Sequence, residues 1–265
     1  VEWLLELMNR EGHWSDIVNF TMDGEPFVHP EFETIVSLAS DYGYRPRFAS
    51  NGYLVRPDRA RYLAENAGFR ITIDFSPYQD YYENARGFGG SWNTVRENLS
   101  CLLSLTKRYK GVYVEITDMS NWCYDDKQPR EGDLERLKAM FKEIAYDKDQ
   151  VRFSQRRFHS ALGAKGQFGG GKKYYVCPRP WSSLVIRWNG DCAICCRDLE
   201  NTTVLGNVFE SQSIMRIWRG EPYQRVRKAL AKGQPERIPA CAHCDLPWDE
   251  RRWKMSNVIR TYLTR

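Results

Sequence analysis

The residues with the clearest chemistry are cysteines near the end of the chain. Six of the eight cysteines lie at or after residue 177, and two C-x-x-C spacings, Cys192 to Cys195 and Cys241 to Cys244, each let two thiolates reach one metal centre. Cysteines grouped in this way favour metal ligation in a reducing compartment over a disulfide scaffold. We therefore expect a metal centre in the C-terminal third of a cytoplasmic protein.

A β-hairpin is predicted over residues 183–196. The pair Asn189-Gly190 lies between two apolar runs, and Asn-Gly is typical of a type I′ turn, in which both central residues need positive φ. In the register that this turn implies, Leu184 faces Cys195. The returning thiol then lies close to Cys177, at the start of the first strand.

Strand alternation places Cys192 and Cys196 on the face opposite to Cys195. The other candidate ligands come from three places in the chain, and we expect their sulfurs to converge on one metal centre: Cys177, Cys195, Cys241 and Cys244. Tetrahedral thiolate sites suit both zinc and iron–sulfur clusters. A zinc knuckle with four cysteine ligands is therefore the alternative to a cluster on spacing alone.

The segment before the cysteines must form the scaffold, and in it strands alternate with helices. Strands are predicted over residues 16–22, 46–50, 69–75, 112–116 and 151–153. A helix precedes each of them, over residues 2–10, 30–42, 57–67, 92–109 and 133–146, and a loop is expected around Arg86-Gly87. This order specifies right-handed parallel βαβ units, in an open sheet or a barrel.

The length of 265 residues favours one large domain, alone or with a small appendage. Residues 156–176 lack periodicity and carry a glycine cluster, so we interpret them as a linker. The linker separates an N-terminal domain, residues 1–155, from a cysteine module, residues 177–246, in which helices are expected over residues 213–218 and 221–231. Residues 247–265 contain a final amphipathic helix, predicted over residues 249–263.

The charge is mild, at +5 from 39 basic and 34 acidic residues, and the basic residues are dispersed. This balance does not favour a nucleic-acid partner. No apolar run approaches membrane-spanning length, and the N-terminal residues lack the features of a signal peptide. We expect no membrane partner.

The cysteine pattern resembles the C-terminal module of radical S-adenosylmethionine enzymes, called SPASM or twitch, which holds an auxiliary four-iron, four-sulfur cluster. Seventeen residues separate Cys177 from Cys195, with Gly190 at the hairpin tip. Cys241 and Cys244 then close the pattern. The resemblance implies that these four cysteines bind the auxiliary cluster.

Four motifs in residues 1–155 resemble the same family, in the family's order. Met22-Asp-Gly-Glu-Pro26 resembles the Gly-Gly-Glu-Pro motif that receives the amino group of S-adenosylmethionine, with aspartate in place of the first glycine. Ser50-Asn-Gly52 and Thr72-Ile-Asp74 resemble two strand motifs, and Arg86-Gly87 resembles an Arg-Gly whose guanidinium pairs with the methionine carboxylate. The resemblance implies an S-adenosylmethionine site at Asp23, Gly24, Glu25, Pro26, Ser50, Asn51, Thr72, Asp74 and Arg86.

The resemblance implies an α/β fold, with a partial (β/α)6 TIM-like barrel that lacks its first strand and a small C-terminal module of hairpin and helices. It implies reductive cleavage of S-adenosylmethionine to a 5′-deoxyadenosyl radical, hydrogen abstraction from a peptide or a small biosynthetic intermediate, and electron exchange with the auxiliary cluster. An electron donor such as a flavodoxin or ferredoxin would serve it. The competing hypothesis is a non-catalytic binding protein with a zinc-stabilised module on a degenerate barrel.

The family's C-x-x-x-C-x-x-C loop, which ligates a second four-iron, four-sulfur cluster, does not occur in the 265 residues. In the family this loop precedes the first helix, and the sequence begins at that helix. We therefore expect an N-terminally truncated sequence, the alternative being a relative that has lost the redox centre. We also expect that these 265 residues alone do not cleave S-adenosylmethionine.

Other residues have less specific expected roles. A loop after the fourth strand provides candidates for substrate contact, with an ordinary solvated loop as the alternative: Asp118, Asn121, Trp122 and Tyr124. Cys101, inside a predicted helix, is expected to be a small core residue. His243 is expected to be a solvent-facing spacer between the last two cysteines.

Overall fold

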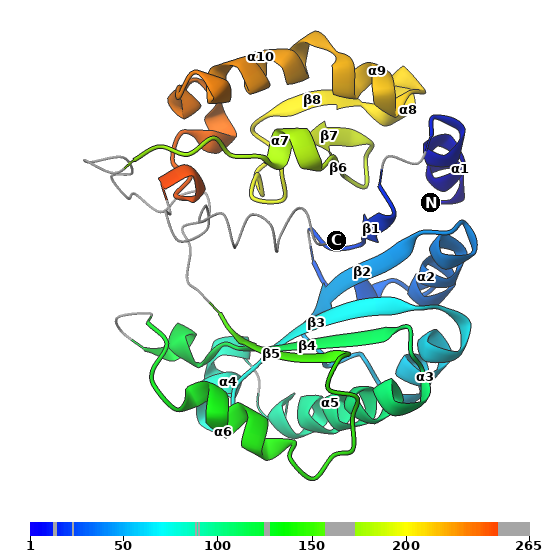
Figure 1. Ribbon diagram of the computed structural model, residues 1–265, viewed down its shortest axis with the longest axis vertical. Helices are drawn as coiled ribbons and strands as arrows, with labels where there is room; N and C mark the ends of the chain where they lie inside the picture. The colour runs from blue at the N-terminus through cyan, green and yellow to red at the C-terminus, as the bar shows by residue number, and fades with distance from the viewer. Residues whose placement is uncertain are drawn as a thin grey trace. The chain divides into compact units, whose positions relative to one another are not determined.

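The computed structural model describes residues 1–12, 15–22, 24–87, 89, 91–124, 128–156 and 173–248. The chain divides into two compact units, Val1–Phe158 and His159–Arg265 (Figure 1). Asp23, the central part of the expected linker and the expected helix over residues 249–263 lie outside the described residues. None of the described helices combines the length and the apolar character needed to cross a lipid bilayer.

The first unit is built on a five-stranded parallel sheet whose strands follow sequence order. These strands are β1 (Ile17–Asn19), β2 (Arg45–Ser50), β3 (Phe69–Phe75), β4 (Val112–Asp118) and β5 (Val151–Gln155). All five predicted strands are therefore confirmed. A consecutive parallel order is the topology of a barrel, whereas a doubly wound sheet reverses its strand order at a switch point.

Six helices of the first unit are described: α1 (Glu2–Arg10), α2 (Phe32–Asp41), α3 (Pro57–Asn66), α4 (Gln79–Arg86), α5 (Ser91–Arg108) and α6 (Asp133–Met140). Three expectations were wrong. Pro30 does not begin α2, because it lies between a separate 3-10 turn, η1 (Pro26–Val28), and the first residue of the helix, Phe32. The expected loop before Gly87 is helix α4, which ends at that glycine in the left-handed conformation. Helix α6 ends before the predicted residue 146.

The helices cover one face of the sheet. In β3, Ile71, Ile73 and Phe75 are fully buried in the core cluster that also contains apolar side chains of α3 and α5. Thr72 and Asp74 alternate to the other face. Successive right-handed crossovers place their helices on the same side, as α3, α5 and α6 show beside β3 and β4 (Figure 1). The face turned away from these helices is thus the polar one, and the predicted ligand-binding residues of β3 lie on it.

Gly52, after β2, is tightly packed against the core. Its φ is +83°, and a Cβ atom there would lie 2.9 Å from Val95 Cγ1 and 3.0 Å from Ile73 Cγ2. Gly43 has the same φ, but a Cβ atom there would have no other atom within 4 Å. We expect Gly52→Ala to lower the free energy of unfolding by about 2–5 kcal/mol, and Gly43→Ala by about 1–2 kcal/mol from backbone strain alone. Urea denaturation of both variants measures this difference, and equal losses would contradict it.

The second unit contains a three-stranded antiparallel sheet of β6 (Val185–Ile186), β7 (Asp191–Ala193) and β8 (Val204–Asn207). Its described helices are α7 (Arg179–Ser182), α8 (Val208–Ser211), α9 (Ile214–Arg219) and α10 (Glu221–Ala231). Three 3-10 turns follow, η3 (Pro235–Arg237), η4 (Pro239–Cys241) and η5 (Leu246–Trp248). The helices predicted over residues 213–218 and 221–231 are confirmed to within one residue.

The hairpin is present, but its predicted register was wrong by one residue. Val185 pairs with Ala193, so Leu184 does not face Cys195. Within Asn189-Gly190 only the glycine has positive φ, at 86°. The connection is therefore a three-residue loop with a left-handed glycine at its end, whereas a type I′ turn needs positive φ at both residues.

Candidate metal centre and cofactor site

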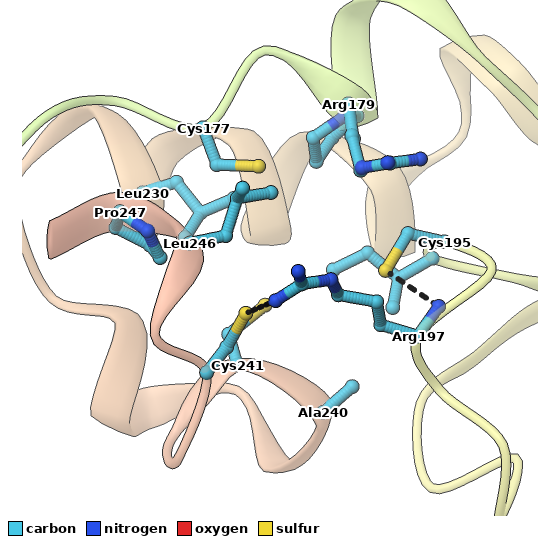
Figure 2. A pocket seen from close by; sticks show the side chains of 12 residues that line it. Cys177, Arg179, Cys195, Arg197, Leu230, Ala240, Cys241, Leu246 and Pro247 are labelled. Carbon is cyan, nitrogen blue, oxygen red and sulfur yellow. Dashed lines mark hydrogen bonds between the residues drawn. The ribbon is translucent and has the colours of Figure 1, made fainter. Parts of the chain in front are cut away.

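The four predicted ligand cysteines line one pocket of the second unit (Figure 2). Cys177 and Cys195 are buried, and Cys241 and Cys244 are half-buried. The remaining lining is mostly apolar, with two arginines: Arg179, Pro180, Ile194, Arg197, Leu230, Ala240, Leu246 and Pro247. The structure thus brings together thiols from three separate segments.

Backbone hydrogen bonds bring Cys177 to the closing turn. The Tyr175 N–H donates to the Pro247 carbonyl at 2.8 Å, so the segments that precede Cys177 and follow Cys244 run side by side. The Cys244 N–H donates to the Cys241 carbonyl at 3.1 Å and closes the C-x-x-C turn. Two backbone contacts therefore place three of the four thiols at the pocket.

The loop that carries Cys195 is organised by Asp198, which is fully buried. Its carboxylate accepts three hydrogen bonds of 2.8–2.9 Å from the pair Thr202-Thr203. The hydroxyl of the second threonine accepts from the Ala240 N–H at 3.2 Å, directly before Cys241. Asp198 was not predicted from the sequence, where its only signal is its place between a cysteine-rich strand and the next strand.

The other described cysteines lie away from the pocket. Cys192 is fully buried, and Cys196 is exposed and accepts a hydrogen bond from Arg179 Nη1 at 3.2 Å. Cys101 is half-buried and packs against the core of the first unit, as expected. His243 is exposed, which agrees with a solvent-facing spacer.

Burial raises the pKa of three of the pocket thiols and makes them weak acids. It raises the pKa of Cys195 to about 11 and also raises the pKa of Cys177 and of Cys241. A metal or cluster that binds here must therefore displace thiol protons, as at other thiolate sites. Burial alone would lower the pKa of Arg197, but the neighbouring Cys244 and Asp245 raise it, so the guanidinium stays charged.

The donor set of the pocket fits an iron–sulfur cluster. Among the described lining residues the thiols are the only ligand groups, and soft sulfur ligands select zinc, copper(I) or iron–sulfur clusters. Among the described residues, no three His, Cys, Asp or Glu side chains are grouped as a single metal ion requires. A zinc ion needs all its sulfurs at about 2.3 Å from one point. A four-iron cluster takes each thiolate on a separate iron, so it accepts more widely separated thiols.

In the first unit, Glu25 joins predicted cofactor residues at the carboxyl end of β2. Its carboxylate accepts from Ser50 Oγ at 2.8 Å and from the Asn51 N–H at 2.7 Å. It also accepts at 3.2 Å from the backbone of η1 (Pro26–Val28). Gly24, directly before Glu25, has a φ of +110°, in the region that favours glycine. The carboxylate therefore braces the strand end and has few acceptor sites left for a ligand.

A second group lies at the carboxyl end of β3. Arg86 Nη2 donates to the Asp74 carbonyl at 3.2 Å, and Arg156 Nη1 donates to Asp74 Oδ2. Tyr82 links the two groups, because its hydroxyl donates to the Asn51 carbonyl at 3.2 Å and its ring centroid lies 5.5 Å from the Arg86 guanidinium. Among the described residues, Arg86 Nε and Asp74 Oδ1 are buried and have no hydrogen-bond partner.

Thr72 lies apart from these groups, inside β3, where it is paired with Ala49 and Glu115. Three of the four candidates for substrate contact after β4 are buried and hydrogen-bonded within the first unit: Asp118, Asn121 and Tyr124. Trp122 is 44% exposed, and the Arg156 guanidinium lies 5.9 Å from its ring centroid. Most of this loop is therefore structural.

Comparison with known proteins supports this assignment of the pocket. Residues 177–245 match the model of the SPASM family, described as an iron–sulfur cluster-binding domain. The match begins at the first pocket cysteine and includes the last. No curated protein sequence matches the chain.

Solved structures are similar over most of the chain. BtrN in complex with AdoMet and 2-DOIA is 17% identical, with a TM-score of 0.57 over 92% of this chain and 78% of BtrN. Native anSMEcpe with bound AdoMet and Cp18Cys peptide is 15% identical, with a TM-score of 0.59 over 91% of this chain and 78% of the other. Streptococcus suis SuiB bound to S-adenosylmethionine is 15% identical, with a TM-score of 0.50 over 85% and 59%. At these identities the likeness establishes the fold, and with the SPASM match it confirms the predicted resemblance.

Proposed function

We propose that this chain, whose residues 177–245 match the SPASM family, acts as a radical S-adenosylmethionine enzyme with an auxiliary four-iron, four-sulfur cluster. The observation that carries the proposal is the pocket lined by Cys177, Cys195, Cys241 and Cys244. In such an enzyme, reductive cleavage of S-adenosylmethionine supplies a 5′-deoxyadenosyl radical that abstracts hydrogen from the substrate.

The pocket cysteines would hold the auxiliary cluster. They provide four sulfur ligands in a mostly apolar surrounding, and none of the described lining residues offers a competing carboxylate or imidazole. Exchange of electrons with this cluster requires a one-electron partner, for which we propose a flavodoxin or ferredoxin. The free thiols favour a reducing compartment, so we propose a cytoplasmic location.

The two groups at the carboxyl ends of β2 and β3 would bind S-adenosylmethionine. A buried hydrogen-bonding atom without a partner costs free energy, and a ligand that completes its hydrogen bond removes that cost. Arg86 Nε is such a donor and would face the methionine carboxylate, while Asp74 Oδ1 is an acceptor for a donor group of the same ligand. Glu25, Ser50 and Asn51 would hold the strand end in place for these contacts.

The substrate we propose is a peptide or a small biosynthetic intermediate. Both classes occur among the similar structures, since BtrN is bound to 2-DOIA and anSMEcpe to a peptide. The polar face of the sheet offers hydrogen-bonding groups to either class, including Thr72 and Asp74.

Equilibrium dialysis of labelled S-adenosylmethionine against the full-length, cluster-loaded protein tests this proposal. We expect saturable binding that S-adenosylhomocysteine displaces and ATP does not, because the orphaned groups complement the amino acid part of the ligand. Absence of saturable binding would contradict the enzyme and favour the non-catalytic binding protein.

A further inference from the structure

We propose that Arg197 is a positioning residue that raises the reduction potential of the auxiliary cluster, and that its ion-pair partner Asp245 limits this effect. The inference rests on the proposed function, because it requires a cluster in the four-cysteine pocket. It concerns a residue that is not itself a ligand.

Arg197 contacts two of the four thiols, from two separate segments (Figure 2). Its backbone N–H donates to Cys195 Sγ at 3.4 Å, and its guanidinium Nη1 donates to Cys244 Sγ at 3.6 Å. The residue is only 8% exposed and forms part of the pocket wall. A permanent positive charge is thus held against the sulfurs in a mostly apolar surrounding.

This position favours the reduced cluster. Reduction adds one electron, and hence one negative charge, to the cluster and its thiolates, and the added charge is attracted to the guanidinium. Hydrogen bonds to the sulfurs withdraw electron density and act in the same direction. Because the guanidinium is buried, solvent and salt screen this attraction far less than at the surface. Arg197 should therefore make the reduction potential more positive.

Asp245 has the opposite charge and a different position. Its carboxylate accepts a hydrogen bond from Arg197 Nη1, so it holds the guanidinium against Cys244. The Asp245 side chain is 26% exposed, against 9% for Arg197. The carboxylate lies closer to solvent and offsets part of the effect of the guanidinium. Its neutralisation should make the potential more positive.

Arg179 also lines the pocket, and its backbone N–H and its charge act on the Cys177 thiol, but its guanidinium donates to a different sulfur. Its Nη1 donates to Cys196, which is exposed and does not line the pocket. Among the described contacts, the guanidinium that donates to a ligand thiol is that of Arg197, and this contact assigns the larger effect to that residue.

Redox titration of the reconstituted 265-residue chain tests the inference, with dithionite as reductant and the reduced cluster followed by electron paramagnetic resonance. We expect Arg197→Met to shift the midpoint potential to a more negative value, Asp245→Asn to shift it to a more positive value, and Arg197→Lys to lie between Arg197→Met and the wild type. The control is Arg225→Gln, at an exposed arginine that pairs with Glu221 on α10, and it should leave the potential unchanged.

An unchanged or more positive potential in Arg197→Met, at the iron content of the wild type, overturns the inference. If Arg197→Met does not retain the cluster, the potential of Asp245→Asn becomes the test. An unchanged or more negative potential in Asp245→Asn then overturns the inference. A purely structural role of Arg197 predicts no opposite shifts in the two variants. A wild-type chain that binds no iron would overturn the proposed function, whereas a wrong shift of potential in a chain that binds iron overturns the inference alone. The two failures are therefore distinguishable.

Discussion

Alanine at any one of Cys177, Cys195, Cys241 or Cys244 is expected to remove most of the iron that the second unit binds. Each thiol is one of four that line the pocket, and the part of the lining that the structure describes holds no carboxylate or imidazole that would replace a missing sulfur. Each thiolate binds one iron, so the loss of one cysteine leaves one iron of the cluster without a protein ligand. Assembly of the cluster then depends on the three thiols that remain. Iron and acid-labile sulfide per chain, measured after anaerobic reconstitution, give the result.

Cys195 and Cys196 form a matched pair for this experiment. They are neighbours in the sequence and undergo the same substitution, but only Cys195 lines the pocket, whereas Cys196 is exposed. Cys192→Ala provides a second control, because Cys192 is buried outside the pocket. Loss of iron from Cys196→Ala or Cys192→Ala, with iron retained in Cys195→Ala, would show that the ligand set is wrong.

The second large effect is expected at Arg86. Arg86→Met should weaken S-adenosylmethionine binding roughly ten- to hundredfold, because a lost charge-assisted hydrogen bond in a partly buried site costs about 1.5–3 kcal/mol. The buried Nε without a partner among the described residues is the donor that the ligand would use. Calorimetric titration of the full-length, cluster-loaded protein measures the affinity.

Arg70→Met is the matched control for Arg86→Met. Arg70 lies in β3 and is exposed, with its guanidinium 5.4 Å from the centroid of the Tyr113 ring. It is four positions before Asp74, away from the carboxyl end of the strand. We expect its substitution to leave the affinity unchanged. An unchanged affinity in Arg86→Met would remove Arg86 from the site, and an equal loss in both variants would indicate a general effect of charge.

The sequence predicted the elements whose patterns are strong. Strict alternation of apolar residues gave β3 its observed bounds, Phe69–Phe75, because the buried side chains meet the helix layer at every second position. The cysteine spacing predicted the convergence of four thiols on one pocket, although the hairpin register behind that argument was wrong. The convergence depends on backbone contacts such as that of Tyr175 with Pro247, which tolerate a shift of one residue in the hairpin.

Other features were not predictable because they arise only from tertiary contacts. In α4, Tyr82 is the only buried residue, so the helix shows little apolar periodicity. Asn-Gly fits the two-residue type I′ turn and also the three-residue loop that ends in a left-handed glycine. The pair alone therefore does not predict which of these two hairpin connections forms. Arg197 meets Cys244 across 46 intervening residues, and no local pattern in the sequence indicates that contact.

The metal and sulfide content of the anaerobically reconstituted 265-residue chain distinguishes an iron–sulfur cluster from a zinc ion in the second unit. We propose that the pocket of Cys177, Cys195, Cys241 and Cys244 holds an iron–sulfur cluster. We expect four iron and four acid-labile sulfide per chain, no zinc, and loss of both iron and sulfide in Cys195→Ala. One zinc per chain, without sulfide, and its loss in the same variant would contradict the cluster and establish the zinc-stabilised module.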